Sequence, residues 1–321
     1  MSAKSSRTVR FHEYGEPADV LALETTEIPD PEAGRVRVRV SATGLNPADW
    51  ALCRGFAPGT LPRGIGSDVS GTVEAVGEGV SDVAVGDLVF GSADFAGQPS
   101  AGAADVAILR SWFRIPDGLD PISAATLPMV VTTAVWTLDL MDIHPGQTLL
   151  VHGAGGMVGY AAVQIAVRRG VRVIATAGPT FAADLEGFGA TVTPYGEGMV
   201  SRVRALAGGS VDLVLDVPRP SEGTLPGLIA LADGDPKRVV TISNHDEARR
   251  LGARVNIDEL LASGQFPDSG ILNDYAKLAA AGEFRLPIAR TYPLGGWREA
   301  MELSVSGNPR GKLVLLPQED A

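Results

Sequence analysis

The sequence predicts an α/β chain made of a compact β-barrel domain and a doubly wound parallel-sheet domain. Residues 7 to about 120 consist mostly of short strands separated by glycine turns. From about Ile122 onward, apolar strand runs alternate with helical segments, which is typical of parallel strands covered on both faces. The segment Thr148–Ala177 then joins a strand, a glycine turn, a helix and a second strand within the length of one βαβ unit.

The barrel prediction depends on three strand patterns. Arg35–Val40 alternates arginine with valine, so we expect buried valines on one face and exposed arginines on the other. Val69–Val76 and Asp87–Phe90 are further strands, and the glycines that follow them favour tight turns.

The doubly wound domain is predicted from a regular series of elements followed by a C-terminal tail that we expect to return to the barrel. The predicted domains are therefore residues 1–121 with 265–321, and residues 122–264. The expected elements are a helical stretch broken by Pro128 (Ile122–Met141), strands at Thr148–His152, Val171–Ala177, Thr191–Tyr195, Val211–Val217, Lys237–Ser243 and Arg254–Ile257, helices at Phe181–Phe188, Met199–Leu206, Ile271–Ala281 and Trp297–Ser306, and a last strand at Gly311–Leu316.

The glycine turn after the first parallel strand predicts a dinucleotide site. Gly153, Gly156 and Gly159 recur at three-residue spacing between the strand and the helix. Such a turn lets the backbone approach a pyrophosphate, and the N–H groups of Met157 and Val158 at the helix start would face it. A glycine turn by itself also occurs in methyltransferases and in plain packing turns, so those alternatives stay open at this point.

Composition narrows the range of partners. The chain has 321 residues and a net charge of −11, so we do not expect it to bind nucleic acid, which requires clustered Lys and Arg. A single cysteine, Cys53, excludes an intramolecular disulfide and a multi-cysteine zinc site. No apolar run is long enough to predict a membrane span, and the first residues lack the apolar core of a signal peptide. We therefore expect a cytoplasmic protein.

The order of motifs resembles the zinc-independent branch of the medium-chain dehydrogenase/reductase superfamily, which contains quinone oxidoreductases and enoyl reductases. The resemblance covers nearly the whole chain and implies a GroES-like barrel, a Rossmann domain, an active site in the cleft between them and a homodimer. Its motifs are FHEYGEPADVLALE (Phe11–Glu24), ATGLNPADW (Ala42–Trp50), LPRGIGSDVSGTVEAVGEGV (Leu61–Val80), VAVGDLVFG (Val83–Gly91), GAGGMVG (Gly153–Gly159), VDLVLDV (Val211–Val217) and GKLVLLP (Gly311–Pro317).

Departures from the zinc-dependent relatives favour a metal-free reductase. Those relatives carry a cysteine near Asn46, a Gly-His-Glu where Gly66–Asp68 stands here, and a four-cysteine lobe, all of which are missing. Without thiolate or imidazole ligands we expect no zinc. Hydride transfer would then need an acceptor activated by conjugation. Enoyl reductases of the family carry a tyrosine at the position of Ala57, and its loss favours a small quinone or conjugated ketone over an enoyl thioester.

The end of the second parallel strand favours NADPH over NADH. An acidic residue there would bind the ribose hydroxyls of NAD, but the sequence reads Ala175–Gly178 and the first acid after the turn is Asp184. The basic residue that usually follows this strand in the family is missing too. We expect Thr176, Gly178 and Tyr195, which matches a family tyrosine beside the adenosine phosphate, to bind the phosphate instead. A salt-bridging arginine from the C-terminal tail is the alternative.

The remaining predicted site residues come from the resemblance and from their place at strand ends. Each also has a plain structural interpretation, such as a turn asparagine, a buried helix threonine or a core aromatic. The expected cofactor neighbours are Asn46 (also the candidate catalytic residue), Thr133, Ser243, Asn244 and Lys312, and the expected substrate wall is Trp50, Phe56 and Ala57.

Together these observations predict an NADPH-dependent reductase of quinones or α,β-unsaturated ketones. An enoyl-thioester reductase of a polyketide or fatty-acid route is the alternative within enzymes, and a non-catalytic NADPH-binding protein is the alternative outside them.

Overall fold

The computed structural model describes residues 4–96, 98–264 and 270–320. The chain divides into two compact units, which we call unit 1 (Met1–Met129 with Ser269–Ala321) and unit 2 (Val130–Asp268). Among the described residues, no helix is both long and apolar enough to cross a membrane.

A closed barrel forms the centre of unit 1. Strands β3 (Val36–Leu45), β5 (Asp68–Val76), β6 (Leu88–Ala93) and β7 (Val106–Arg114) pair in this order, and β7 returns to pair with β3. Closing the sheet in this way leaves none of these four strands with a free edge. The predicted β-barrel is therefore confirmed.

The C-terminal tail extends this barrel. Strand β15 (Lys312–Leu316) pairs antiparallel with β3, with Leu313 opposite Leu45, and β14 (Ile288–Pro293) pairs parallel with β15. This register places Lys312 next to the residue that follows β3, which is Asn46. A separate sheet contains β1 (Lys4–Phe11), β2 (Ala22–Ile28) and β4 (Arg63–Gly64).

One core of unit 1 joins strands and helices from both ends of the chain. Its buried residues include Val9 and Phe11 from β1, Trp50 and Cys53 from α2, and Leu313 from β15. The helices are α1 (Pro17–Val20), α2 (Pro47–Cys53), α3 (Pro121–Ala124), α11 (Ile271–Ala280) and α12 (Trp297–Ser306).

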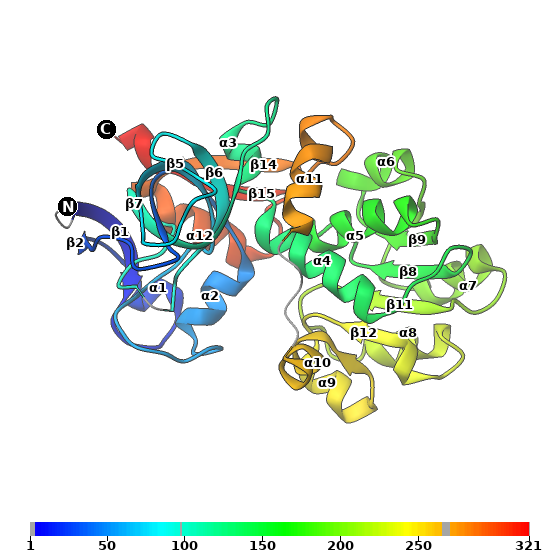
Figure 1. Ribbon diagram of the computed structural model, residues 1–321. Coiled ribbons are helices and arrows are strands. Elements are labelled where there is room, and N and C mark those ends of the chain that lie inside the picture. The colour runs from blue at the N-terminus through cyan, green and yellow to red at the C-terminus, as the bar shows by residue number, and fades with distance from the viewer. Residues whose placement is uncertain (1–3, 97, 265–269, 321) are drawn as a thin grey trace. The chain divides into compact units, whose positions relative to one another are not determined.

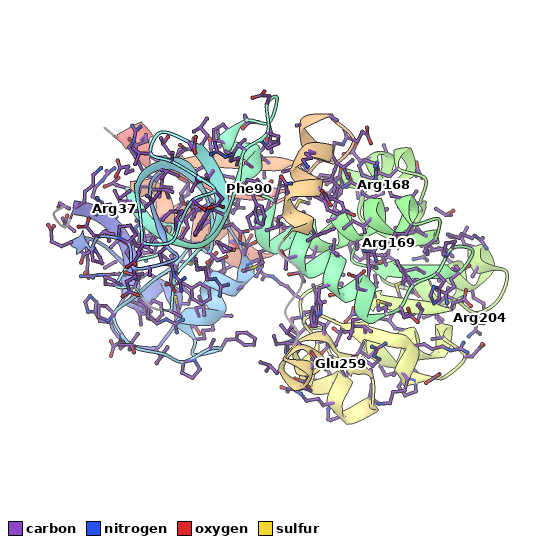
Figure 2. All side chains as sticks on the ribbon, in the orientation of Figure 1. Arg37, Phe90, Arg168, Arg169, Arg204 and Glu259 are labelled. Carbon is purple, nitrogen blue, oxygen red and sulfur yellow. The ribbon has the colours of Figure 1, made fainter. Side chains whose placement is uncertain are left out.

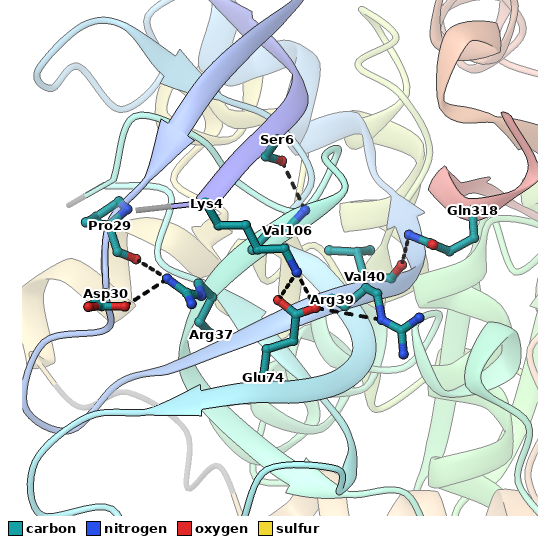
Figure 3. A network of polar contacts seen from close by, with 10 residues as sticks. All are labelled: Lys4, Ser6, Pro29, Asp30, Arg37, Arg39, Val40, Glu74, Val106 and Gln318. Carbon is teal, nitrogen blue, oxygen red and sulfur yellow. Dashed lines mark hydrogen bonds and ion pairs between the residues drawn. The ribbon is translucent and has the colours of Figure 1, made fainter. Parts of the chain in front are cut away.

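The arginines of β3 do not share one exposed face, which corrects the prediction for that strand. The Arg39 side chain is 55% exposed and lies near Glu74, whereas Arg37 is buried. Arg37 Nη1 donates to the Pro29 carbonyl and to Asp30, 3.2 and 3.1 Å away (Figure 3). The segment before β3 thus covers Arg37, and the strand register shifts between Arg37 and Val38.

Unit 2 is a doubly wound parallel sheet, as predicted. Its strands lie in the order β10-β9-β8-β11-β12-β13, and every pairing is parallel. Figure 1 labels the four central strands β9, β8, β11 and β12. The chain order reverses between β8 and β11, and ligands of such sheets bind at this switch point, at the carboxyl ends of the strands. The strands are β8 (Thr148–His152), β9 (Arg172–Thr176), β10 (Thr191–Thr193), β11 (Leu213–Asp216), β12 (Val239–Thr241) and β13 (Arg254–Val255).

The second half of unit 2 differs from the predicted series of strands and helices. The expected strand Arg254–Ile257 stops at Val255, and α10 (Asn256–Ser263) begins there with Asp258 and Glu259 in its first turn, where acidic side chains favour a helix. Short helices α8 (Leu225–Leu231) and α9 (His245–Leu251) were not predicted. The other helices are α4 (Pro128–Leu140), whose first residues belong to unit 1, α5 (Met157–Arg168), α6 (Pro179–Gly187) and α7 (Met199–Ala207).

Candidate active-site cluster and dinucleotide cradle

A buried polar cluster in unit 1 joins Asn46 to Lys312. Asn46 is the N-cap of α2, and Pro47 occupies the first helical position, where its missing N–H costs nothing. Lys312 Nζ donates to Asn46 Oδ1 over 2.7 Å and lies 3.7 Å from Asp68 Oδ2. The Lys312 and Asp68 side chains are only 3% and 1% exposed, so this pair is shielded from solvent.

The side-chain amide of Asn46 has no free hydrogen. Its Nδ2 donates to the Gly44 carbonyl at 3.2 Å and to Asp68 Oδ2 at 2.9 Å, and an amide nitrogen carries only two hydrogens. Its Oδ1 accepts the bond from Lys312 Nζ. Asn46 therefore cannot donate a further side-chain hydrogen bond.

Two carboxyl groups accompany the one ammonium group in this cluster. Asp49 accepts hydrogen bonds from the backbone N–H groups of Asn46 and Gly66, at 2.7 and 2.8 Å. Burial raises the pKa of Asp49 to about 6, against the lowering effect of these two bonds. Burial also raises the pKa of Asp68, opposed by Lys312, and lowers the pKa of Lys312, opposed by Asp68.

The predicted substrate wall divides between core and surface. Trp50 is 2% exposed and its Nε1 donates to Ser304 Oγ at 2.7 Å, so it belongs to the core of unit 1. Phe56 is 57% exposed. Ala57 is exposed as well, and its carbonyl accepts a 2.5 Å hydrogen bond from Arg63.

In unit 2, two glycines of the turn are required by the fold. Gly153 has φ +80°, and a Cβ at this position would lie 2.4 Å from Pro218 Cγ. A Cβ at Gly159 would lie 2.7 Å from the Gly153 carbonyl oxygen, so helix α5 can approach the strand only without one. Both positions exclude larger residues for reasons of packing.

The other glycines of the turn leave open space. A Cβ at Gly155 would meet nothing within 4 Å, and one at Gly156 would meet only the Gly153 carbonyl, at 3.6 Å. Gly156 caps α5 without a side-chain bond, so the first N–H groups of the helix, on Met157 and Val158, have no capping side chain. Backbone donors beside free space are what a pyrophosphate requires, and the turn therefore fits a dinucleotide.

Thr176 belongs to the turn rather than to an exposed phosphate site. Its Oγ1 accepts the Gly153 N–H at 3.0 Å and lies 2.8 Å from His152 Nδ1. The residue has no solvent exposure. The Thr176 hydroxyl thus holds the glycine turn in this structure.

The end of β9 carries no carboxylate. Ala177 and Gly178 follow the strand, and the next acid, Asp184, accepts a hydrogen bond from Tyr160 at 3.0 Å. Tyr195 is 61% exposed, and its hydroxyl oxygen lies 3.7 Å from where a Cβ of Gly178 would be. The structure thus brings Gly178 and Tyr195 together.

Buried polar groups line the switch point. His152 and Asp216 end β8 and β11 and are paired across the two strands. Burial lowers the pKa of His152 to about 4 and raises that of Asp216 to about 6, although the Thr241 hydroxyl donates to Asp216 at 2.8 Å. Both line a small void of about 10 Å³, roughly the space of one water, together with Asn244.

The last predicted cofactor neighbours make local bonds. Asn244 is 7% exposed and donates to the Ser221 carbonyl and to Glu247, at 3.3 and 2.7 Å. Ser243 donates to the Pro218 carbonyl. Thr133 is half-buried on α4, where its carbonyl accepts the Thr137 hydroxyl at 2.7 Å.

Sequence reasoning missed two polar residues that these sites contain. Asp49 could have been found, because Asn46 and Asp49 have the spacing of a capping box, and the structure contains that box. Asp68 gave no sequence signal of burial, whereas the place of His152 inside the first parallel strand does indicate a buried, hydrogen-bonded side chain. In residues 4–96, 98–264 and 270–320, no group of three or more His, Cys, Asp or Glu side chains is arranged to hold a metal ion.

Comparison with known families agrees with this architecture. Residues 32–109 match the model of the alcohol dehydrogenase GroES-like domain, and residues 188–315 match the model described as zinc-binding dehydrogenase. The chain belongs to the medium-chain dehydrogenase/reductase superfamily.

Its relatives include polyketide synthases and quinone oxidoreductases. Erythronolide synthase EryA2 of Saccharopolyspora erythraea is 35% identical over 292 residues, which is 88% of this chain and 8% of that protein. Human quinone oxidoreductase is 34% identical over 180 residues, 54% of each chain. The aligned part of this chain therefore spans less than two thirds of the length of each of these curated relatives.

Solved structures match over the whole fold. The quinone oxidoreductase from Coxiella burnetii has a TM-score of 0.79 and 26% identity, with 98% of this chain and 99% of that chain covered. The CurK enoyl reductase has a TM-score of 0.80 with 97% and 99% covered, and its 24% identity supports the fold alone.

Proposed function

We propose that this protein is an NADPH-dependent reductase that transfers hydride to a quinone or an α,β-unsaturated ketone. Membership of an oxidoreductase superfamily supports an enzyme. The observation that carries the cofactor assignment is the pairing of an open glycine turn at Gly155 with a β9 end that lacks a carboxylate. An acidic group at that strand end would favour NADH and repel the 2′-phosphate of NADPH.

The bound dinucleotide would supply the hydride, and the chain would supply position and charge. The N–H groups of Met157 and Val158 would bind the pyrophosphate, and Gly178 with Tyr195 would lie beside the adenosine ribose. Asn46, whose amide is held in one orientation by Lys312 and Asp68, would lie beside the nicotinamide ribose. With Ala57 in place of a tyrosine, we assign protonation of the product to water.

The proposal includes a metal-free site. Zinc in proteins is held by thiolates, imidazoles and carboxylates. The cluster around Asn46 instead presents an amide whose hydrogens are used and an ammonium group within 3.7 Å of Asp68, which would repel a metal cation. We also retain the predicted cytoplasmic location, homodimer and domain boundaries as parts of this proposal.

An enoyl-thioester reductase is the second candidate function. The match to EryA2 favours it, because that polyketide synthase aligns with 88% of this chain, against 54% for human quinone oxidoreductase. The exposed alanine at position 57, where enoyl reductases of the family carry a tyrosine, argues for the smaller acceptors. A non-catalytic NADPH-binding protein is the third candidate.

A substrate screen with the purified protein tests these candidates together. NADPH oxidation would be followed over a concentration series of each acceptor: quinones, cyclic and linear enones, and enoyl thioesters. NADH is the matched cofactor control. We expect turnover with quinones or enones and a preference for NADPH. Turnover confined to enoyl thioesters would establish the second function, and NADPH binding without any turnover would establish the third. Elemental analysis showing stoichiometric zinc would contradict the metal-free site.

A further inference from the structure

The turn after β10 runs along the same edge of the sheet as the end of β9. The two strands pair with Thr193 opposite Thr176, and the Ala177 N–H donates to the Thr193 carbonyl at 3.1 Å. Tyr195 stands two residues beyond this pairing, and its hydroxyl lies over Gly178. The position of that hydroxyl therefore depends on the conformation of the turn at residues 194–198.

This turn needs a side chain to hold it. Gly196 and Gly198 both adopt positive φ, at +85° and +72°, and glycine leaves a free chain many alternative conformations. Tyr195 is exposed, so packing does little to fix it. Side-chain hydrogen bonds are then the main restraint on the turn.

Arg202 supplies that restraint. From the first turn of α7 its Nε donates to Thr193 Oγ1 at 3.2 Å, Nη1 donates to the Glu197 carbonyl at 2.7 Å, and Nη2 donates to the Pro194 carbonyl at 2.8 Å. Nη2 also lies 3.5 Å from the Tyr195 carbonyl. One planar guanidinium thus ties together both ends of the turn that carries Tyr195.

The charge of Arg202 is not neutralised by these contacts. All of its partners are neutral oxygens, and among the residues that the structure describes no carboxylate lies within ion-pair distance of it. The sequence has no other Lys or Arg between Arg172 and this position. The Arg202 charge therefore lies close to the end of β9 without an ion-pair partner among the described residues, and the one acidic residue of the turn, Glu197, meets it through its backbone carbonyl.

We propose that Arg202 is the residue that determines cofactor specificity, because it fixes the Tyr195 turn and supplies the positive field for the 2′-phosphate. This inference rests on the proposed function, in which Gly178 and Tyr195 lie beside the adenosine ribose. The 2′-phosphate adds close to two negative charges that NADH lacks. Loss of Arg202 should therefore weaken NADPH binding much more than NADH binding.

Four variants separate charge from positioning. Arg202→Met removes both, Arg202→Lys keeps the charge but not the fork of donors, and Tyr195→Phe removes only the hydroxyl. The matched control is Arg204→Met: Arg204 lies two residues further along the same helix, is exposed, and donates to the Ala230 carbonyl rather than to the turn (Figure 2). Dissociation constants for NADPH, NADH, adenosine 2′,5′-bisphosphate and AMP would be measured by titration calorimetry at two salt concentrations.

We expect Arg202→Met to raise the Kd of NADPH and of the bisphosphate about tenfold, as loss of a charge-assisted contact does, and to change the Kd of NADH and AMP less than about twofold. Arg202→Lys should lie between wild type and Arg202→Met. The effects of Arg202→Met and Tyr195→Phe should not add, since Arg202 acts partly through Tyr195.

Two results would overturn the inference while the proposed function stands. In the first, wild type prefers NADPH and the Arg202→Met variant keeps the same ratio of the NADPH and NADH dissociation constants. The other is an equal change in that ratio from Arg204→Met. A wild type that binds NADH and NADPH equally would overturn the NADPH assignment itself, and the role of Arg202 with it.

Discussion

Lys312 Nζ lies 2.7 Å from Asn46 Oδ1, although the two residues are 266 positions apart in the sequence. The bond fixes the direction of the amide: its oxygen faces the ammonium and its nitrogen faces Asp68 and the Gly44 carbonyl. A family asparagine that would otherwise rotate is thereby held as an acceptor. Lys312 is therefore a positioning residue in addition to any contact of its own with a cofactor.

Replacing Lys312 should destabilise unit 1 through the charges that it leaves behind. In Lys312→Met, the buried Asp68 loses its cation, and breaking a buried pair from one side typically costs about 3 kcal/mol or more. Urea unfolding would measure the change in the free energy of unfolding. The exposed Lys277→Met on α11 is the control and should change it by less than about 0.5 kcal/mol.

A double variant tests the cause of that loss. Lys312→Met combined with Asp68→Asn should recover a large part of the stability, because no unpaired carboxylate then remains at that position. Fully additive losses in the two single variants would mean that Lys312 stabilises the fold by packing rather than by charge.

Replacement of a turn glycine by alanine should affect cofactor binding at Gly155 and stability at Gly153. Gly155→Ala should fold normally, since its Cβ meets no atom within 4 Å, but should weaken NADPH binding roughly tenfold by filling the space for the pyrophosphate. Gly153→Ala should instead lower the free energy of unfolding by about 2 kcal/mol or more, because of its positive φ and the contact with Pro218.

Thermal melts with and without NADPH would separate these outcomes. Gly187→Ala at the end of α6 has the same free space around its Cβ as Gly155 but lies outside the turn, and should leave NADPH affinity unchanged. If Gly155→Ala binds NADPH as wild type does, the pyrophosphate does not approach that glycine.

Structural features that depend on local sequence pattern could be predicted, whereas contacts that depend on pairing between distant strands could not. The βαβ unit around Gly153 was predictable because strand, turn and helix lie within thirty residues and follow their own periodicities. The contact of Lys312 with Asn46 requires β15 to pair with β3, and nothing local in either segment specifies that register. The burial of Thr176 was not predictable for the same reason, since it depends on the pairing of His152 with it across β8 and β9.

Asp216 should make stability fall as the pH rises. Its native pKa of about 6 lies above the value near 3.9 of an unfolded aspartate, so between these values the native state binds more protons than the unfolded state. Stability from this group is therefore lost between about pH 4 and 6, by about 3 kcal/mol in total. The free energy of unfolding of Asp216→Asn relative to wild type, measured with urea, should be larger at pH 7.5 than at pH 4.5. An equal difference at both pH values would contradict the assignment.

His152 should have the opposite effect on stability. Its native pKa of about 4 lies below the value near 6.5 of an unfolded histidine, so between these values the unfolded state binds more protons than the native state. Stability from this group is present above about pH 6.5 and is lost as the pH falls toward 4, by about 3 kcal/mol. His152→Gln keeps a side chain that can bond to Thr176 and removes the titration, so it should be less sensitive to acid than wild type. A direct check is the NMR titration of the imidazole: a midpoint near 6.5 in the folded protein would show that His152 is open to solvent, and that Thr176 holds the glycine turn without its help.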